Sequence, residues 1–239
     1  MTVKTKHHIC AKILLLLGLT FLACKDTGCK DIMKGSSLRR YDVSDRIEKI
    51  NKEISVLEKN DKDEKSAIRL GDLHEQLATI YIEKEDIDTA LVHVDKAFGY
   101  RRNNPYLNYL AGLIYGNKGA KSGLKDEINK SEEYYRRAIN LKSNYDEALY
   151  GLAILLFLYK NERDEPILIL EALYKRRPSY YEARFALGRI YYESARVQEA
   201  LGVYMALEND LNKLPDSPII NNYKENCANN IRRIRSEMQ

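Results

Sequence analysis

The residues of this 239-residue chain that could perform chemistry do not combine into a familiar catalytic set. Beyond residue 23 the only histidines are His74 and His93, with no HExxH pattern and no cysteine pair at metal-binding spacing. Residues 116–122 (GNKGAKS) share composition with a phosphate-binding loop, but they lack adjacent Gly-Lys-Ser and a preceding apolar strand. Acidic pairs such as Glu132 and Glu133 stand among basic residues, where surface ion pairs are expected. We therefore predict a protein that is not an enzyme and holds neither a metal nor a dissociable cofactor.

The cysteine with the clearest chemistry is Cys24. It follows a basic start with three lysines and an apolar run, residues 13–22 (ILLLLGLTFL), that is too short to cross a bilayer. The residues before it, Phe21-Leu22-Ala23, resemble the lipobox of bacterial lipoprotein precursors. That resemblance implies cleavage after residue 23 and a covalent lipid on Cys24, whereas Cys29 follows polar residues that do not fit the pattern. An ordinary secretory signal or an uncleaved signal anchor is the alternative.

The location of the protein follows from this reading. Residues 1–23 are expected to be a signal peptide and residues 24–41 a lipidated tether, facing the periplasm from an inner or outer bacterial membrane. Removal of the signal peptide lowers the formal net charge from +4 to +1, because that segment carries three lysines and no acid. This charge gives no reason to expect nucleic acid as a partner. Cys29 and Cys227 then remain either as free thiols or as a disulfide.

The composition favours helices. With 12 glycines and 5 prolines the chain is poor in turn-forming residues, and 31% of its residues are charged. Residues 42–65 are predicted to form an amphipathic helix, whose apolar positions are spaced four and three apart at Val43, Ile47, Ile50, Ile54 and Leu57. This apolar seam either packs on the next helix or pairs with a second copy of the chain.

A repeat is the strongest signal in the sequence. Small residues at Ala78, Gly112, Ala153 and Gly188 are separated by 34, 41 and 35 residues. A second series agrees with the first, since its members are 41, 35 and 34 residues apart at Ala97, Ala138, Leu173 and Leu207. In most units a tyrosine follows the small residue by three, as Tyr191 follows Gly188.

A period near 34 residues with small residues at these places resembles the tetratricopeptide repeat (TPR) family. The resemblance implies an all-α helix-turn-helix solenoid of about four repeats over residues 66–211, divided as 66–104, 105–145, 146–178 and 179–211. The helix of residues 42–65 would precede the array, and residues 212–239 would form a C-terminal capping helix. Seven extra residues in the second unit predict a protruding loop at residues 116–130. The usual tryptophan near the start of each first helix is replaced by His74, Asn108, Leu149 and Arg184.

In this family the first helix of each repeat lines a concave surface that binds ligands. Carried over position by position, the resemblance implies a largely aromatic binding groove formed by Tyr106, Tyr109, Leu113, Tyr150, Ile154, Phe157, Phe185, Arg189 and Tyr192. Large exposed rings are effective anchors for another protein or peptide. In the alternative reading, these rings pack on one another or on the C-terminal helix.

The sequence therefore predicts a non-catalytic, lipid-anchored scaffold or adaptor that binds a protein partner in a cell-envelope complex. Two other functions are left open. The protein could be an accessory subunit of a transport system that binds a small apolar ligand, or a structural envelope protein that self-associates through residues 43–57.

Overall fold

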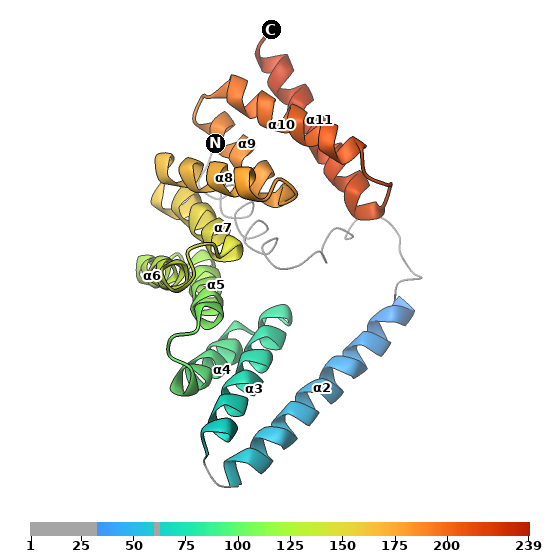
Figure 1. Ribbon diagram of the computed structural model, residues 1–239. Coiled ribbons are helices and arrows are strands. Elements are labelled where there is room, and N and C mark those ends of the chain that lie inside the picture. Colours follow the sequence, from blue (N-terminus) through green and yellow to red (C-terminus); the bar gives the residue numbers. More distant parts are fainter. Residues whose placement is uncertain (1–32, 60–62) are drawn as a thin grey trace. The chain divides into compact units, whose positions relative to one another are not determined.

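The computed structural model describes residues 33–59 and 63–239, with side chains from residue 43 onward. Every regular element in these residues is a helix (Figure 1), which confirms the predicted all-α class. In chain order the helices are α2 (Met33–Lys59), α3 (Glu64–Glu83), α4 (Ile87–Tyr100), α5 (Pro105–Ser122), α6 (Lys125–Leu141), α7 (Asp146–Leu155), the π-helical turn η2 (Leu156–Lys160), α8 (Asp164–Arg176), α9 (Tyr181–Glu193), α10 (Val197–Asn212) and α11 (Pro218–Glu237). The predicted signal peptide, Cys24 and Cys29 lie outside the described residues.

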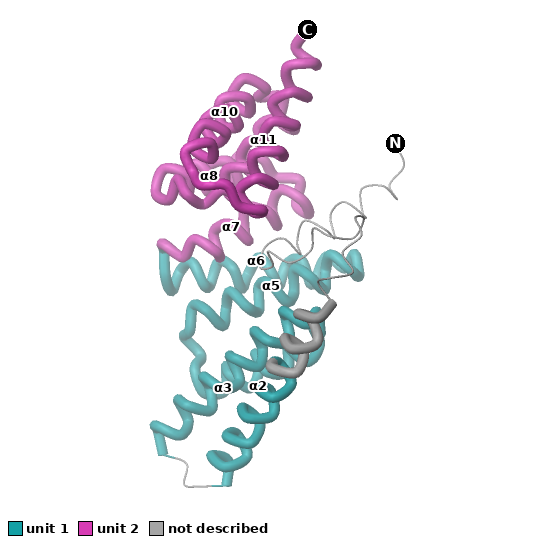
Figure 2. Tube along the Cα trace, turned by 90° about the vertical axis from the view of Figure 1, so that its right-hand side faces the viewer, with its two compact units in different colours: residues 1–143 teal, residues 144–239 magenta. Residues whose placement is uncertain are grey.

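The chain divides into two compact units, coloured separately in Figure 2: residues 1–143 and residues 144–239. In each unit, helices that follow one another in sequence pack together. The first unit pairs α3 with α4 and α5 with α6, and the second pairs α7 with α8 and α9 with α10.

Several helices begin at residues whose side chains satisfy the free backbone N–H groups of the first turn. The Asp63 carboxylate accepts a hydrogen bond from the Ser66 N–H at 2.7 Å, and Asp86 serves α4 in the same way. Asn104 accepts from the Tyr106 N–H at 2.7 Å, directly before Pro105 at the first helical position of α5. Local sequence therefore fixes where these helices start.

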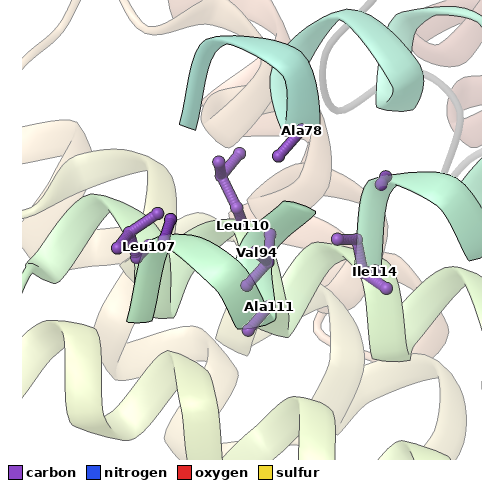
Figure 3. Packing of buried hydrophobic residues seen from close by; sticks show 8 residues of the cluster. Ala78, Val94, Leu107, Leu110, Ala111 and Ile114 are labelled. Carbon is purple, nitrogen blue, oxygen red and sulfur yellow. The ribbon is translucent and has the colours of Figure 1, made fainter. Parts of the chain in front are cut away.

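The core of the first unit lies where α3, α4 and α5 meet (Figure 3). Its buried members are mostly small or branched: Ala78, Ala90, Val94, Ala97, Leu107, Leu110, Ala111 and Ile114. The alanines let neighbouring helices approach closely, and the larger side chains fill the space that remains. Two small-residue positions of the sequence repeat, Ala78 and Ala97, thus belong to the packing of helix pairs.

Helix α2 packs along α3 through the apolar seam predicted for residues 43–57. Ile50 and Ile54 are buried against Leu70, Leu73 and Leu77 of α3. The seam is therefore used within the chain, the first of the two arrangements left open by the sequence. The helix spans Met33–Lys59 rather than residues 42–65, so the predicted tether, residues 24–41, is helical from residue 33.

The protruding loop predicted for residues 116–130 is wrong. Helix α5 continues to Ser122 and α6 begins at Lys125, so the extra residues lengthen both helices. The turn itself requires only Gly123, whose φ of 74° ends α5 in the left-handed conformation. Gly119 is a packing residue instead, because a Cβ at this position would lie 2.5 Å from Ile128 Cδ1 on α6.

In the second unit the same kind of close approach joins α9 to α10. A Cβ on Gly188 would lie 2.7 Å from Tyr204 Cζ, and the Tyr204 hydroxyl donates to the Phe185 carbonyl at 3.3 Å. Helix α11 packs on α10 as the predicted C-terminal helix, burying Cys227, Ile231 and Ile234. The Cys227 thiol donates to the Tyr204 carbonyl at 2.9 Å.

We expect Gly112→Ala to lower the free energy of unfolding by about 1–3 kcal/mol, since a Cβ there would meet Tyr135 Cδ1 at 2.7 Å. Gly202→Ala is the matched control, because this helical glycine has no atom within 4 Å of its added Cβ. The control should be neutral or stabilising by up to about 1 kcal/mol. Urea denaturation of both variants checks the difference, and equal effects would contradict the packing role of Gly112.

Candidate functional site

The predicted binding residues of the first unit lie on α5, beside α3. We call the surface formed by Glu75, Thr79, Tyr106 and Tyr109 the α3–α5 face. The hydroxyl oxygens of Thr79 and Tyr106 lie 3.1 Å apart, and the rings of Tyr106 and Tyr109 are 6.1 Å apart between centres. Both rings are half-buried, so each retains an edge that a ligand could contact. The structure therefore brings Tyr106 and Tyr109 together.

Polar contacts hold the Glu75 carboxylate of this face in position. Glu75 accepts a hydrogen bond from Asn104 Nδ2 at 3.0 Å and lies 3.4 Å from Arg101 Nη1. Arg101 also pairs with Asp72. Burial raises the pKa of Glu75, while the Arg101 charge acts in the opposite direction. Asn104 thus links the start of α5 to α3, a role that was not recognised from the sequence, although an Asn before Pro105 is a typical helix start.

Four of the nine predicted groove residues are buried, which corrects the expectation that they offer exposed contact surface: Leu113, Tyr150, Ile154 and Phe157. Tyr150 packs on Tyr180, with ring centres 5.3 Å apart, and burial raises the pKa of its hydroxyl. Apolar side chains at these positions gain more from burial within their own unit than from contact with water. Leu113 belongs to the first unit, and Tyr150, Ile154 and Phe157 belong to the second.

Phe157 lies in the π-helical turn η2 and is covered by two arginines. The guanidinium carbons of Arg163 and Arg189 lie 4.5 and 5.7 Å from its ring centre. Arg163 also donates to the Phe157 carbonyl at 3.3 Å, and Asn161 ends the turn with a φ of 56°. Phe157 and Arg189 thus lie close together, in a cation–π contact within the unit.

Helix α11 contacts the predicted binding residues Phe185 and Tyr192. Tyr223 lies 5.7 Å from Phe185 between ring centres, and its hydroxyl donates to Glu182 at 2.5 Å. The Tyr192 hydroxyl donates to Glu237, and its ring lies 4.5 Å from the guanidinium carbon of Arg233. In the second unit, the alternative in which these rings pack on one another or on the C-terminal helix therefore describes the contacts better than an open aromatic groove.

The two histidines, treated as unrelated in the sequence, are in contact. His74 Nδ1 and His93 Nδ1 lie 3.1 Å apart, and stacked rings of Tyr81 and Tyr100 flank the pair. A hydrogen bond between them requires one ring to carry its proton on Nδ1 and the other to accept. Burial, the His93 ring and Lys96 lower the pKa of His74 to about 4. The pair fills the space between α3 and α4.

In residues 43–59 and 63–239, whose side chains the structure describes, no group of three or more His, Cys, Asp or Glu side chains is placed to hold a metal ion. No helix of the described segments has both the length and the apolar character needed to cross a bilayer.

Comparison with known proteins supports the fold. No protein-family model matches the chain. Over 78 residues it is 32% identical to Protein O-mannosyl-transferase Tmtc3 of Drosophila melanogaster, a match covering 33% of this chain and 8% of the fly protein. The chain thus spans less than a tenth of that relative.

Solved structures match over most of the chain. A thermophilic TPR protein of Thermus thermophilus has a TM-score of 0.56 at 15% identity, covering 80% of this chain and 94% of its own. MamA has a TM-score of 0.55 at 19% identity, covering 80% and 100%, and PilF of Pseudomonas aeruginosa a TM-score of 0.55 at 15% identity, covering 70% and 71%. The fold is therefore TPR-like, and the predicted fold class is confirmed.

We expect the folded protein to lose stability as the pH falls from about 6.5 towards 4. An unfolded His74 takes up a proton near its ordinary pKa of 6.5, whereas the folded residue does so only near pH 4, so falling pH favours the unfolded state. The slope is at most about 1.4 kcal/mol per pH unit for this one group. Urea denaturation at several pH values should give a flatter profile for His74→Phe than for the wild type. Parallel stability–pH profiles for the variant and the wild type would contradict the lowered pKa of His74.

Proposed function

We propose that this protein is a non-catalytic scaffold that is tethered to a bacterial membrane by a lipid on Cys24 and binds another protein through the α3–α5 face. The observation that carries the binding proposal is the adjacent pair of half-buried tyrosines, Tyr106 and Tyr109, in which the Tyr106 hydroxyl also contacts Thr79. Two rigid rings offer apolar contact area at small entropic cost, together with hydroxyl groups for hydrogen bonds.

The TPR-like fold supports this proposal because helical repeats present extended surfaces suited to polypeptide ligands. The fold alone does not assign a function, so the proposal depends on the chemistry of the face. A partner segment with an apolar or aromatic side chain would pack on Tyr106 and Tyr109. A backbone or side-chain donor of the same segment would reach Glu75, whose side chain remains about one-fifth exposed.

The tether is supported by the sequence before residue 25. Two or three acyl chains on Cys24 would hold the protein stably at a membrane, where one chain alone binds only marginally. A polypeptide-binding surface close to a membrane suits a scaffold of a cell-envelope complex, which is the function that we infer.

Photo-crosslinking tests the binding surface. With a photoreactive residue in place of Tyr109, we expect capture of one defined partner protein in the native cell, identified by mass spectrometry. Val92 on α4 is the control position, because its side chain is 52% exposed but lies off the α3–α5 face. The same adducts at the same yield from both positions would contradict the proposal.

Metabolic labelling with an alkyne fatty acid tests the tether. Cys24→Ser should abolish labelling and release the protein from the membrane fraction, because the acylated thiol is lost. Cys29→Ser provides a matched control five residues away and should leave labelling unchanged. Labelling that depends on Cys29, or that survives Cys24→Ser, would overturn the proposed anchor.

A further inference from the structure

A cavity of about 700 Å³ lies within the first unit, between the end of α4, the beginning of α5 and the last two turns of α6. Its size is within the range of small-molecule binding sites. Its lining combines two aromatic rings, two arginines and three asparagines without a carboxylate: Phe98, Gly99, Arg102, Asn103, Asn108, Tyr134, Arg137, Asn140 and Leu141. None of these residues belongs to the α3–α5 face.

The part of the cavity beside α5 is widened by a small side chain, Asn108, where the last repeat has the large Arg184. Asn108 precedes Gly112 by four residues, as Arg184 precedes Gly188. Arg184 is fully buried, and its guanidinium carbon lies 4.5 Å from the ring centre of Tyr174. The shorter Asn108 side chain turns back to donate to the Asn104 carbonyl at 2.8 Å. The corresponding space in the first unit is therefore open.

The residues around Asn108 and around Arg184 also occupy equivalent positions in their repeats. Phe98 follows Ala97 as Tyr174 follows Leu173, so each place has an aromatic ring in the same position. In the second unit the chain's own Arg184 occupies the space, and its charge is balanced by Asp210 at 2.7 Å. The equivalent of Asp210, three residues after Ala138, is Leu141. A cation would therefore find a ring but no balancing acid in the cavity of the first unit.

The charge in this cavity favours an anion. Arg102 is exposed and forms no ion pair with other described residues, so its guanidinium is available to a ligand. Arg137 lies over the Tyr134 ring at 5.5 Å and pairs with Glu133 at 2.5 Å, on an exposed surface where the pair is readily exchanged. A guanidinium binds a carboxylate through two parallel hydrogen bonds.

The apolar side of the cavity favours a ring. Phe98 and Tyr134 stack with ring centres 6.0 Å apart, and Leu141 is 45% exposed beside them. An aromatic group placed on these side chains would remove apolar surface from water and gain ring–ring contact. We propose that this cavity binds a ligand in which an aromatic ring is joined to a carboxylate, with the ring on Phe98 and Tyr134 and the carboxylate at Arg102 and Arg137.

Two kinds of ligand carry an aromatic ring joined to a carboxylate: a free aromatic acid and the aromatic C-terminal residue of a polypeptide. The full chain contains no tryptophan, so indole fluorescence reports the ligand alone. We would titrate the protein into N-acetyl-tryptophan, its uncharged amide, and a tetrapeptide ending in tryptophan. The acid should bind about tenfold more tightly than the amide, because only the acid makes charge-assisted hydrogen bonds.

Arg102→Gln should bring the affinities for acid and amide close to each other, while the exposed Arg232→Gln on α11 should leave their ratio unchanged. Asn108→Phe should weaken binding of every probe, because the larger ring would occupy the part of the cavity beside α5. Since that variant also loses the hydrogen bond to Asn104, the exposed Arg102→Gln keeps the test valid if Asn108→Phe fails to fold.

Equal affinity for acid and amide in the wild type, no saturable signal with any probe, or an unchanged ratio in Arg102→Gln would overturn the proposal. Among supporting results, tighter binding of the tetrapeptide than of N-acetyl-tryptophan identifies a polypeptide terminus as the source, and the reverse identifies a free acid. These titrations do not depend on the crosslinking result at Tyr109. A negative titration would overturn the ligand site and leave the scaffold proposal standing, and a negative crosslinking result would overturn the scaffold proposal and leave the ligand site standing.

Discussion

The close approach of paired helices at glycine is the constraint on which the rest of the structure depends. Gly112 meets the Tyr135 ring and Gly188 meets the Tyr204 ring, in each case at a distance that excludes a Cβ. The tyrosine is buried on the second helix of the pair, and the first helix keeps its opposite face for other contacts. The Ser131 hydroxyl, donating to the Gly112 carbonyl at 2.6 Å, further joins α5 to α6. Both helices of the α5–α6 pair line the cavity beside Asn108, and Tyr109 of the α3–α5 face lies 6.2 Å from Tyr135 between ring centres.

The sequence predicted the fold well because its strongest signals report on packing at short range. Small residues at a regular spacing, as at Ala78 and Gly112, and the seam from Val43 to Leu57 identify helix pairs and the contact of α2 with α3. The loop at residues 116–130 was predicted wrongly because glycine has two uses. Gly119 serves a close helix contact, which composition alone does not distinguish from a flexible turn.

The candidate site was predicted only in part, because exposure depends on contacts between residues distant in sequence. Tyr109 and Tyr150 hold equivalent places in the repeat, but Tyr150 is buried against Tyr180 while Tyr109 remains half-buried. The position of a residue in the repeat thus predicts its exposure less well than the neighbouring side chains do. The replaced tryptophan positions contained a further signal, since a polar residue at an interior position must find partners, as Arg184 finds Asp210 and Asn108 finds the Asn104 carbonyl. The shorter Asn108 also leaves space beside it.

The buried thiol of Cys227 can report whether α11 is packed on α10. Burial raises the pKa of Cys227 to about 12, and the thiol is held against the Tyr204 carbonyl of α10. A protonated, enclosed thiol is a poor nucleophile, so it resists oxidants and alkylating reagents while α11 remains docked. Release of the last helix would expose a reactive sulfur. The rate at which this sulfur is modified would then measure how often the end of the chain opens.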